Sequence, residues 1–418
     1  MLFFGHTVNS LQKITLHQRT LFTACLMLFF WTLFDGTVSY ITPLKISQAG
    51  FSDTLLGLII GFSSIAGGTF DFLLSKFLTN THFRRVYLLM FAVCFIYPLI
   101  LWQAKEVWLF LIAMALWGLY YDLDNFASYD FVGRKFSEEE HSSSFGLMSI
   151  FKELGYTISP LIAGFALGAA AIVDWKPILL MFVFLTISFS FYVLLKNITA
   201  KATHDYMEKV TYKPLNFLRE ISVWKKVGSI LLPPLVIIMF YNVFDSFFWT
   251  LGPLLAESFK QLHPFNGLFL TAYTLPFLIT GFLVGMVTKK LGKKRTAFLG
   301  FLVGSLTLSL FYFLHSPLFI LGDILVASFF VGFTIPAING AFADYISESS
   351  AVEREIEALS DFFTNAGYVV GPILAGFLAD RVGGAVTFSI LGIIGAVVAV
   401  ILLIVTPRII NVKVNLPR

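Results

Sequence analysis

Two carboxyl groups stand at matching places in two long apolar stretches of the chain. Asp35 falls within residues 20–44 and Asp245 within residues 228–256, 210 positions later. A carboxylate is costly inside a lipid bilayer, so such a residue usually faces a water-filled cavity and carries a function. Desolvation and a second carboxylate nearby both favour the protonated form of an acid. The two aspartates therefore indicate a site that exchanges protons or cations.

Each aspartate belongs to a polar stripe at helical spacing. Steps of three and four residues place the members of a stripe on one helix face. The stripes are Thr32, Asp35, Ser39 and Thr42 in the first stretch, and Asn242, Asp245, Trp249 and Gly252 in the second. Either acid could instead cap a helix kink or bind a neighbouring helix.

The two aspartates differ in their neighbours. Gly36 and the hydroxyl groups beside Asp35 leave room for water, so we expect Asp35 to be the principal proton site. Asp245 is flanked by aromatic residues, a drier setting that suits charge recognition of a substrate; these are Phe244, Phe247, Phe248 and Trp249.

A third polar group, Tyr120-Tyr121-Asp122-Leu123-Asp124-Asn125, lies in the stretch 107–132. Lys152, in the stretch 144–170, should lie at the same depth as Asp124. A lone lysine at that depth would be costly, whereas a charge pair is tolerated. We therefore expect Lys152 to pair with Asp124 or Asp122, and we regard Asp122 as a further proton-site candidate.

The sequence repeats itself at about half its length. Residues 155–165 and 367–377 share six of eleven residues at an offset of 212, and Asn125 recurs as Asn339 at an offset of 214. Two such halves are typical of carriers that rock around a central site. Small residues allow close helix packing and proline bends a span. We assign packing or hinge roles to Gly155, Pro160, Gly164, Gly367, Gly371, Pro372 and Gly376.

Composition indicates that most of this chain lies in a lipid bilayer. Hydrophobic residues make up 57% of the sequence, charged residues 13%, and the mean hydropathy is +0.82. Soluble proteins carry about 25% charged residues. The apolar runs are continuous rather than alternating, which favours membrane helices over a barrel. The net charge of +4 therefore reflects where the basic residues lie relative to a bilayer and gives no indication of nucleic-acid binding.

About 20 apolar residues cross a bilayer as a helix. On that measure we expect twelve spans: 20–44, 53–76, 84–103, 107–132, 144–170, 177–196, 228–256, 265–288, 296–314, 317–343, 360–379 and 384–407. They form an N-terminal half, 1–196, and a C-terminal half, 228–418, joined by a polar linker, 197–227. The fold class is an all-α membrane protein of two six-helix bundles.

Basic residues give the orientation. The termini, the linker and alternate loops with their helix ends hold 24 of the 29 Lys and Arg residues. Positively charged loops stay in the cytoplasm. We expect both termini and the linker to be cytoplasmic, in a plasma membrane. The first 19 residues lack a cleavage site after the apolar run, so the first span is retained.

The sequence gives no indication of a cofactor or a metal site. Cys25 and Cys94 both fall inside predicted spans, and the seven His residues are scattered. A phosphate-binding glycine loop is absent, so nothing indicates an ATP-driven pump.

Taken together, the chain resembles the major facilitator superfamily (MFS). Twelve spans, the six-plus-six repeat and the basic linker cover nearly the whole sequence. The segment 285–295 resembles the superfamily's loop motif, although Lys289 occupies the usual acid position. The earlier copy, around Gly67 and Asp71, has altered spacing. Basic residues there could bind acids and helix C-termini of neighbouring cytoplasmic ends. The candidates for this cytoplasmic latch are Asp71, Arg84, Arg85, Lys289, Lys290, Lys293, Lys294 and Arg295.

The resemblance also implies a cavity and a direction of transport. The 155–165 pattern is similar to a motif associated with drug:proton antiporters, although Ser159 and Ala163 replace two of its glycines. In the superfamily, the first, fourth, seventh and tenth helices line a central cavity, which both aspartates would then face. The expected cavity residues are Trp31, Thr32, Ser39, Tyr121, Asn125, Asn242, Trp249 and Asn339.

We therefore expect a secondary active transporter that works by alternating access. A cavity with two acids, aromatic rings and one deep lysine disfavours anionic substrates and suits protons with neutral or cationic amphiphiles. Proton-coupled export by a monomer is our first hypothesis. Proton-coupled uptake of a sugar, amino acid or peptide is the alternative, and a membrane enzyme or a non-transporting sensor is more remote.

Overall fold

The structure is a computed structural model, and it describes residues 2–77, 81–168, 173–201, 217–259, 262, 264–348, 353–407 and 410. Throughout these residues the regular structure is helical, and no strand occurs among them. Most of the predicted linker, 202–216, lies outside the described residues.

The first six predicted spans are all present as long helices. Ser137 and Glu140 form a capping box at the start of one of them, with Glu140 Oε2 accepting from the Ser137 N–H at 3.1 Å. The helices are α1 (Leu2–Gln48), α2 (Asp53–Phe77), α3 (Phe83–Gln103), α4 (Val107–Lys135), α5 (Glu138–Leu167) and α6 (Trp175–Lys201).

The C-terminal half contains the remaining helices. Gly292, at a φ of 83°, makes the turn between two of them, a conformation that glycine adopts without strain. The elements are α7 (Phe217–Ser258), α8 (Leu268–Leu291), α9 (Lys293–Leu308), the 3₁₀ turn η3 (Phe311–Phe313), α10 (Pro317–Val331), α11 (Thr334–Glu348), α12 (Glu353–Val382) and α13 (Gly384–Val405).

One predicted span is broken in the structure. The stretch 317–343 folds as α10 and α11, which are separated at Gly332 and Phe333. Pro336 has no N–H to donate to the carbonyl group of Gly332, one turn earlier, so a continuous helix would lose a hydrogen bond there. The uninterrupted helix expected over this stretch is therefore wrong, although the two pieces together still span 317–346 as one apolar unit.

Eleven segments of the described chain are long and apolar enough to cross a membrane. The last span of each half, α6 and α13, is more apolar than the other nine. α5 is not among the eleven; its 30 residues include Lys152, Glu153 and an acidic first turn. With twelve helical spans in two bundles, the predicted all-α membrane fold is confirmed.

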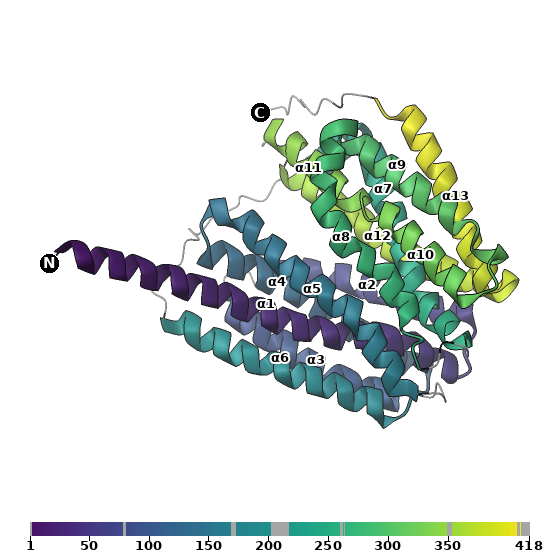
Figure 1. Cartoon of the computed structure of the whole chain (residues 1–418), viewed down its shortest axis with the longest axis horizontal. Coiled ribbons are helices and arrows are strands. Elements are labelled where there is room, and N and C mark those ends of the chain that lie inside the picture. The colour runs from purple at the N-terminus through teal and green to yellow at the C-terminus, as the bar shows by residue number, and fades with distance from the viewer. Residues whose placement is uncertain are drawn as a thin grey trace.

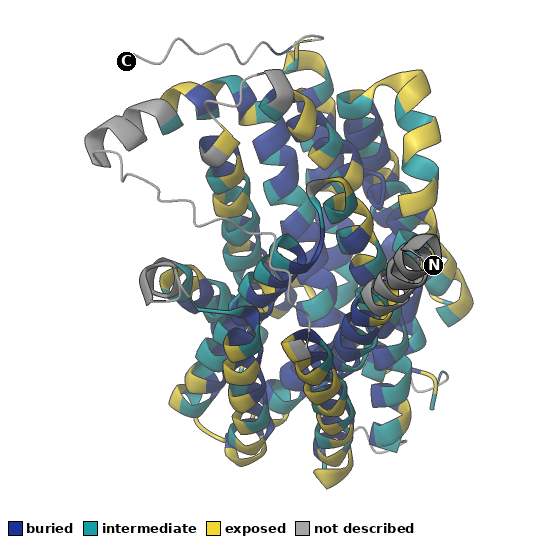
Figure 2. Cartoon of the chain, turned by 90° about the vertical axis from the view of Figure 1, so that its left-hand side faces the viewer, coloured by how far each residue is buried: buried dark blue, intermediate teal, exposed yellow. Residues whose placement is uncertain are grey.

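The two halves form separate bundles that touch at one end. Figure 1 shows them drawing apart toward the side on which α1 begins and α13 ends, and converging at the other side. The contacts between halves join α2 to α12, α5 to α8, and α1 to α7. In Figure 2 the buried residues gather where helices of a bundle face one another. Below, the side on which α1 begins and α13 ends is called the open end, and the side on which the two halves converge is called the closed end.

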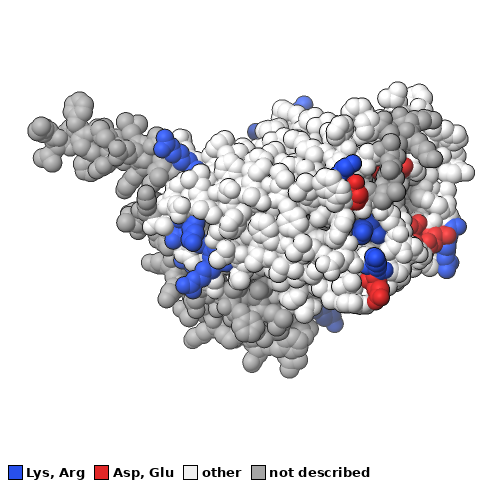
Figure 3. All heavy atoms as spheres, turned by 90° about the horizontal axis from the view of Figure 1, so that it is seen from below, with Lys and Arg blue, Asp and Glu red and all other residues white. Residues whose placement is uncertain are grey.

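The outer surface fits a membrane environment. Many large apolar side chains are exposed, among them Phe282, Leu318 and Ile404 at 72–77%. Figure 3 shows a broad uncharged region between groups of charged residues toward the two ends of the molecule. In water such a surface would favour aggregation, whereas in lipid it is the expected exterior.

Candidate transport site

Asp35 lies at the centre of the N-terminal bundle and accepts three hydrogen bonds. Trp117 Nε1 and Tyr120 OH, both from α4, lie 3.1 and 2.5 Å from its Oδ1. Tyr156 OH from α5 lies 2.8 Å from its Oδ2. The residue is only 2% exposed. Neutral aromatic donors thus replace water around this carboxyl group.

Asp245 has a closely similar environment in the C-terminal bundle. Tyr273 OH from α8 lies 2.5 Å from its Oδ1, and Tyr368 OH from α12 lies 2.8 Å from its Oδ2. The Trp249 indole also donates to this carboxyl group. Tyr156 and Tyr368 are equivalent positions of the internal repeat. The duplication therefore preserved an aspartate–tyrosine pair in each half.

The expected contrast between a wet Asp35 and a dry Asp245 is wrong. Asp245 is 8% exposed, more than Asp35. The protons of the nearby hydroxyl groups are already engaged, because Thr32 and Ser39 donate to backbone carbonyls of their own helix. Thr42 is likewise engaged, at 2.8 Å from the hydroxyl group of Tyr97.

A contact between the halves connects the two acids. The ring of Tyr156 in α5 meets the ring of Trp249 in α7 edge to face, with centroids 6.0 Å apart. Since Tyr156 donates to Asp35 and Trp249 donates to Asp245, a continuous path of side chains runs from one acid to the other.

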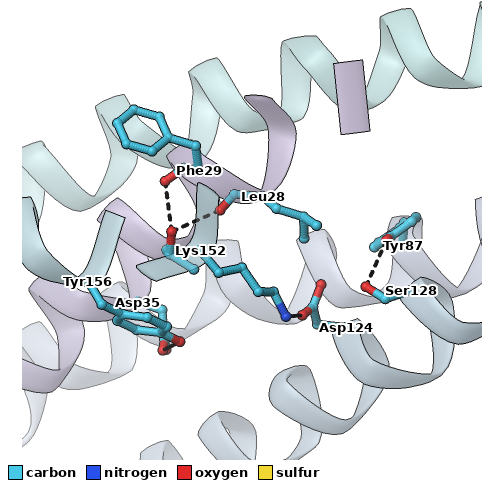
Figure 4. A network of polar contacts seen from close by, with 9 residues as sticks. Leu28, Phe29, Asp35, Tyr87, Asp124, Ser128, Lys152 and Tyr156 are labelled. Atoms are coloured by element: carbon cyan, nitrogen blue, oxygen red, sulfur yellow. Dashed lines mark hydrogen bonds and ion pairs between the residues drawn. The ribbon is translucent and has the colours of Figure 1, made fainter. Parts of the chain in front are cut away.

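Lys152 and Asp124 form a buried ion pair between α5 and α4. Lys152 Nζ lies 2.5 Å from Asp124 Oδ2, and the side chain of Asp124 is 1% exposed. Figure 4 shows Lys152 reaching past α1 to Asp124, while Tyr156 and Asp35 meet nearby. The ammonium group also lies 5.3 Å from the ring centre of Trp31. Each charge is thus compensated within the N-terminal half.

Asp122 is not the partner of Lys152. Its Oδ2 is buried without a hydrogen-bond partner, and it faces the close crossing of α2 at Gly67. Asp71 of α2 interacts with Asp122 electrostatically. The two carboxyl groups lie in the same half, toward the open end.

The expected cavity residues fall into two groups. Tyr121 is 43% exposed, Asn125 and Asn339 are exposed, and Trp249 is partly exposed. The others are buried in helix packing: Trp31, Thr32, Ser39 and Asn242. Thr32 illustrates why, because a Cβ on Gly155 would lie only 2.0 Å from its hydroxyl oxygen, so α5 covers that face of α1. The assignment of these four residues to a cavity surface is wrong in this conformation.

The closed end is held by acids that the sequence analysis did not select. Glu257 of α7 accepts from Tyr40 of α1 at 2.7 Å and from Asn266 at 2.8 Å. Asp380 of α12 accepts from the backbone N–H groups of Asp53 and Thr54, at 2.9 and 2.8 Å. Asp380 of one half therefore caps the first turn of α2 in the other half. We call these interactions the closed-end contacts.

With the geometry established, comparison with known proteins identifies the family. The sequence model described as "Major Facilitator Superfamily" matches residues 20–260 and 234–415. The chain belongs to the major facilitator superfamily. No curated protein matches the sequence of this superfamily member.

Solved structures of transporters share the fold at low identity. A nucleoside transporter, NupG (D323A mutant), has a TM-score of 0.72 at 12% identity, with 92% of this chain and 98% of that chain covered. The peptide transporter POT in complex with sulfate gives 0.71 at 14% identity, covering 94% and 95%. A bacterial homologue of the human lysosomal transporter Spinster gives 0.67 at 11%, covering 93% and 95%. These similarities establish the MFS fold.

The predicted latch residues of this MFS chain make contacts within their own halves. Arg84 donates to the backbone carbonyl of Thr199 at 2.7 Å, near the end of α6. Lys293 lies 2.6 Å from Asp344 Oδ1, and Lys294 donates to the carbonyl of Pro407. Arg85, Lys289, Lys290 and Arg295 are exposed. Asp71 instead faces Asp361 of α12 by electrostatic interaction.

The repeated glycine–proline pattern packs helices at two levels. Gly155, and Gly367 and Gly371 in the second copy, lie against α1 and α7 within their halves. Gly164 lies against Gly267 across the halves. A Cβ on Gly376 would lie 1.9 Å from the carbonyl oxygen of Asp53, so glycine is required where α12 crosses α2. Pro160 and Pro372 contribute backbone carbonyls to the same inter-half crossings, beside Gly267 and Gly57.

Metal binding has no support in the described residues, where no cluster of three His, Cys, Asp or Glu side chains occurs. Both cysteines are buried free thiols. The carboxyl, phenol and indole groups of this site can exchange protons, form hydrogen bonds and attract cations.

Proposed function

We propose that this MFS protein is a proton-coupled transporter that exports neutral or cationic amphiphilic small molecules by alternating access, acting as a monomer. The observation that carries the proposal is the path from Asp35 through Tyr156 and Trp249 to Asp245. It gives each half one buried candidate proton acceptor and connects the two through Tyr156 and Trp249, across the interface that must change during transport.

Alternating access is supported by the asymmetry of the inter-half contacts. The closed-end contacts join the halves, whereas Tyr121, Tyr129 and Phe362 toward the open end are 43–67% exposed. The distribution of basic residues supports a cytoplasmic location of the termini. On that assignment the structure represents an inward-open state, and transport requires the closed-end contacts to break.

Proton binding can be coupled to this change through hydrogen-bond chemistry. The carboxylate of Asp35 accepts from Trp117, Tyr120 and Tyr156. A protonated carboxyl group becomes a donor and keeps fewer acceptor sites. One aromatic donor must then turn away or accept instead. If that donor is Tyr156, its contact with Trp249 in the other half changes as well.

A proton and a cationic substrate that both need the negative charge of the same acids would exchange for one another. A cation near the acids stabilises their ionised forms and disfavours protonation. Proton binding in turn weakens cation binding by the same factor, since such coupling is reciprocal. The carrier would therefore export a cation as protons enter.

Uptake of a polar solute is the second candidate function, because the similar solved structures include a nucleoside transporter and a peptide transporter. Purified protein in liposomes with an imposed pH gradient separates the two. Export predicts that the substrate moves opposite to the proton flux. Movement of substrate with the proton flux would favour uptake, and no gradient-dependent movement of any compound in an amphiphile, nucleoside and peptide panel would contradict both.

A further inference from the structure

The buried and half-buried acids near the centre of the molecule differ in how far their charge is satisfied. Asp35 and Asp245 each accept from three aromatic donors. Asp124 is paired with Lys152. Asp122 also has a carboxyl oxygen without a hydrogen-bond partner, but it lies against α2 of its own half. Glu153, the residue after Lys152 in α5, differs from all of these: in the described part of the chain, no hydrogen bond or ion pair reaches its carboxyl group. Its backbone carbonyl is the group that Thr157 contacts.

Glu153 lies where the two halves face each other. Glu153 is one helical turn from Tyr156 in α5, and Asp245 is one turn from Trp249 in α7. The rings of Tyr156 and Trp249 meet with centroids 6.0 Å apart. The carboxyl group of Glu153 interacts electrostatically with Asp245 and with the neighbouring Lys152. Since Asp124 holds the ammonium group of Lys152 at 2.5 Å, that cation is already engaged. Asp245 contributes a second acid from the opposite half. The surroundings of Glu153 therefore carry an excess of acidic groups over basic ones.

Aromatic side chains border this carboxyl group. The ring of Tyr121 of α4 lies 6.2 Å from that of Trp31, which in turn lies 5.3 Å from the ammonium group of Lys152, the residue before Glu153. Tyr241 of α7 lies one helical turn before Asp245, and both tyrosines interact electrostatically with Glu153. Tyr121 is 43% exposed, so its ring is accessible. Faces of aromatic rings attract organic cations, and the attraction increases when the cation is desolvated.

We infer that Glu153 is the anionic group that binds the positive charge of an organic monocation, with Tyr121 and Tyr241 contacting its apolar body. This inference rests on the proposed function and specifies its substrate class as aromatic or alkyl ammonium compounds. One unpaired carboxylate matches one positive charge. A metal ion would require several oxygen ligands, whereas an ammonium group needs one carboxylate and ring faces.

This assignment separates two tasks among the acids. Asp35 and Asp245 keep their charge satisfied by fixed donors, so they are suited to proton exchange and to signalling between halves. Glu153 has no hydrogen-bond or ion-pair partner among the described residues and is suited to an exchangeable one. Its electrostatic interaction with Asp245 links the bound cation to the proton path.

The test compares two probes of nearly equal shape: a phenylalkyl-trimethylammonium compound and its neutral tert-butyl isostere. Binding to the purified full-length protein is measured by quenching of tryptophan fluorescence. An interaction with a charged group contributes about 1.5–3 kcal/mol, which corresponds to about tenfold or more in affinity. We expect the wild type to prefer the ammonium compound by at least that factor.

Glu153→Gln keeps the shape of the side chain and removes its charge, so it should abolish the preference while the isostere binds as before. The matched control is Glu357→Gln, which neutralises an exposed acid of α12 and should retain the wild-type preference. An equal preference in Glu153→Gln and the wild type, or no preference in the wild type, would overturn the inference.

A labelling experiment on the wild type keeps the inference testable if Glu153→Gln does not fold. Modification of carboxyl groups by a carbodiimide is mapped by mass spectrometry with each probe present. We expect the ammonium compound, and not its isostere, to slow modification of Glu153; equal modification would count against the site. Failure of proton-driven transport with intact ammonium preference would refute the proposed function and leave this inference standing.

Discussion

The ring of Tyr156 in α5 meets the ring of Trp249 in α7 at an interplanar angle of 62°, across the boundary between the two halves of the chain. The same Tyr156 donates its hydroxyl proton to Asp35. One side chain thus connects a buried acid of the first half to an aromatic contact with the second half. In the proposed mechanism, a change in the hydrogen bonding of Asp35 reaches this contact between the halves through Tyr156.

Tyr156→Phe tests this connection because it keeps the ring contact and removes the hydroxyl group. We expect the variant to fold, to lose about 1–2 kcal/mol of stability, and to lose most of its gradient-driven transport. Transport in liposomes and thermal unfolding measure the two effects. The control is Tyr97→Phe, which removes a buried hydroxyl group bonded to Thr42. Equal transport by the two variants would show that the Tyr156 hydroxyl has no part in coupling.

Loss of the ion pair between Lys152 and Asp124 should account for most of the stability lost when either residue is substituted. Lys152→Ala leaves a buried carboxylate without its partner and should lower stability by about 3–5 kcal/mol. Replacing Asp124 by Ala as well should restore much of that loss. Lys176→Ala, in an exposed pair with a separation of 3.8 Å, should change stability by less than about 1 kcal/mol. A double variant no more stable than Lys152→Ala would contradict the pairing.

Asp380 should hold the closed end together. Asp380→Ala removes the acceptor for the first N–H groups of α2. We therefore expect the population of molecules whose halves have separated at the closed end to rise about tenfold or more. Spin labels at positions 105 and 315, on the two halves at that end, report the change as longer distances. Glu106→Gln is the control, because among the described residues the carboxyl group of Glu106 accepts only from Trp108, in its own half. Unchanged distances in Asp380→Ala would rule out this role.

The orientation in the membrane follows from the basic residues and can be measured directly. Cysteines introduced at the exposed positions 290 and 176 should be labelled from opposite sides of the membrane, with position 290 reached from the cytoplasm. Labelling of both from one side would disprove the proposed topology.

The sequence was sufficient to predict the helices because continuous apolar runs leave a membrane chain few alternatives. The exception is residues 332–334, where Pro336 and a tight helix crossing interrupt the apolar run without changing its hydropathy. Gly332 is the residue type that this crossing requires, since a Cβ on it would lie 2.6 Å from Thr280 Oγ1.

The candidate site was harder to predict because side-chain partners come from distant positions. The repeat contained Tyr156 and Tyr368 as identical residues, yet their hydrogen bonds to Asp35 and Asp245 depend on how α5 and α12 pack. The polar stripe around Asp35 was assigned to a cavity, although glycines of α5 allow that helix to cover it. Gly155, which closely approaches Thr32, was the sequence signal for this packing.

Asp35→Asn tests the central claim most directly, because it preserves size and removes the exchangeable proton. The measurement is substrate movement in liposomes, with and without a pH gradient, over a range of pH. Asp323→Asn, at a buried aspartate of α10 that contacts neither central acid, is the control. We predict that Asp35→Asn loses transport against a gradient and its dependence on pH, while energy-independent exchange of substrate remains. Transport by Asp35→Asn against a gradient at the wild-type level would contradict the account.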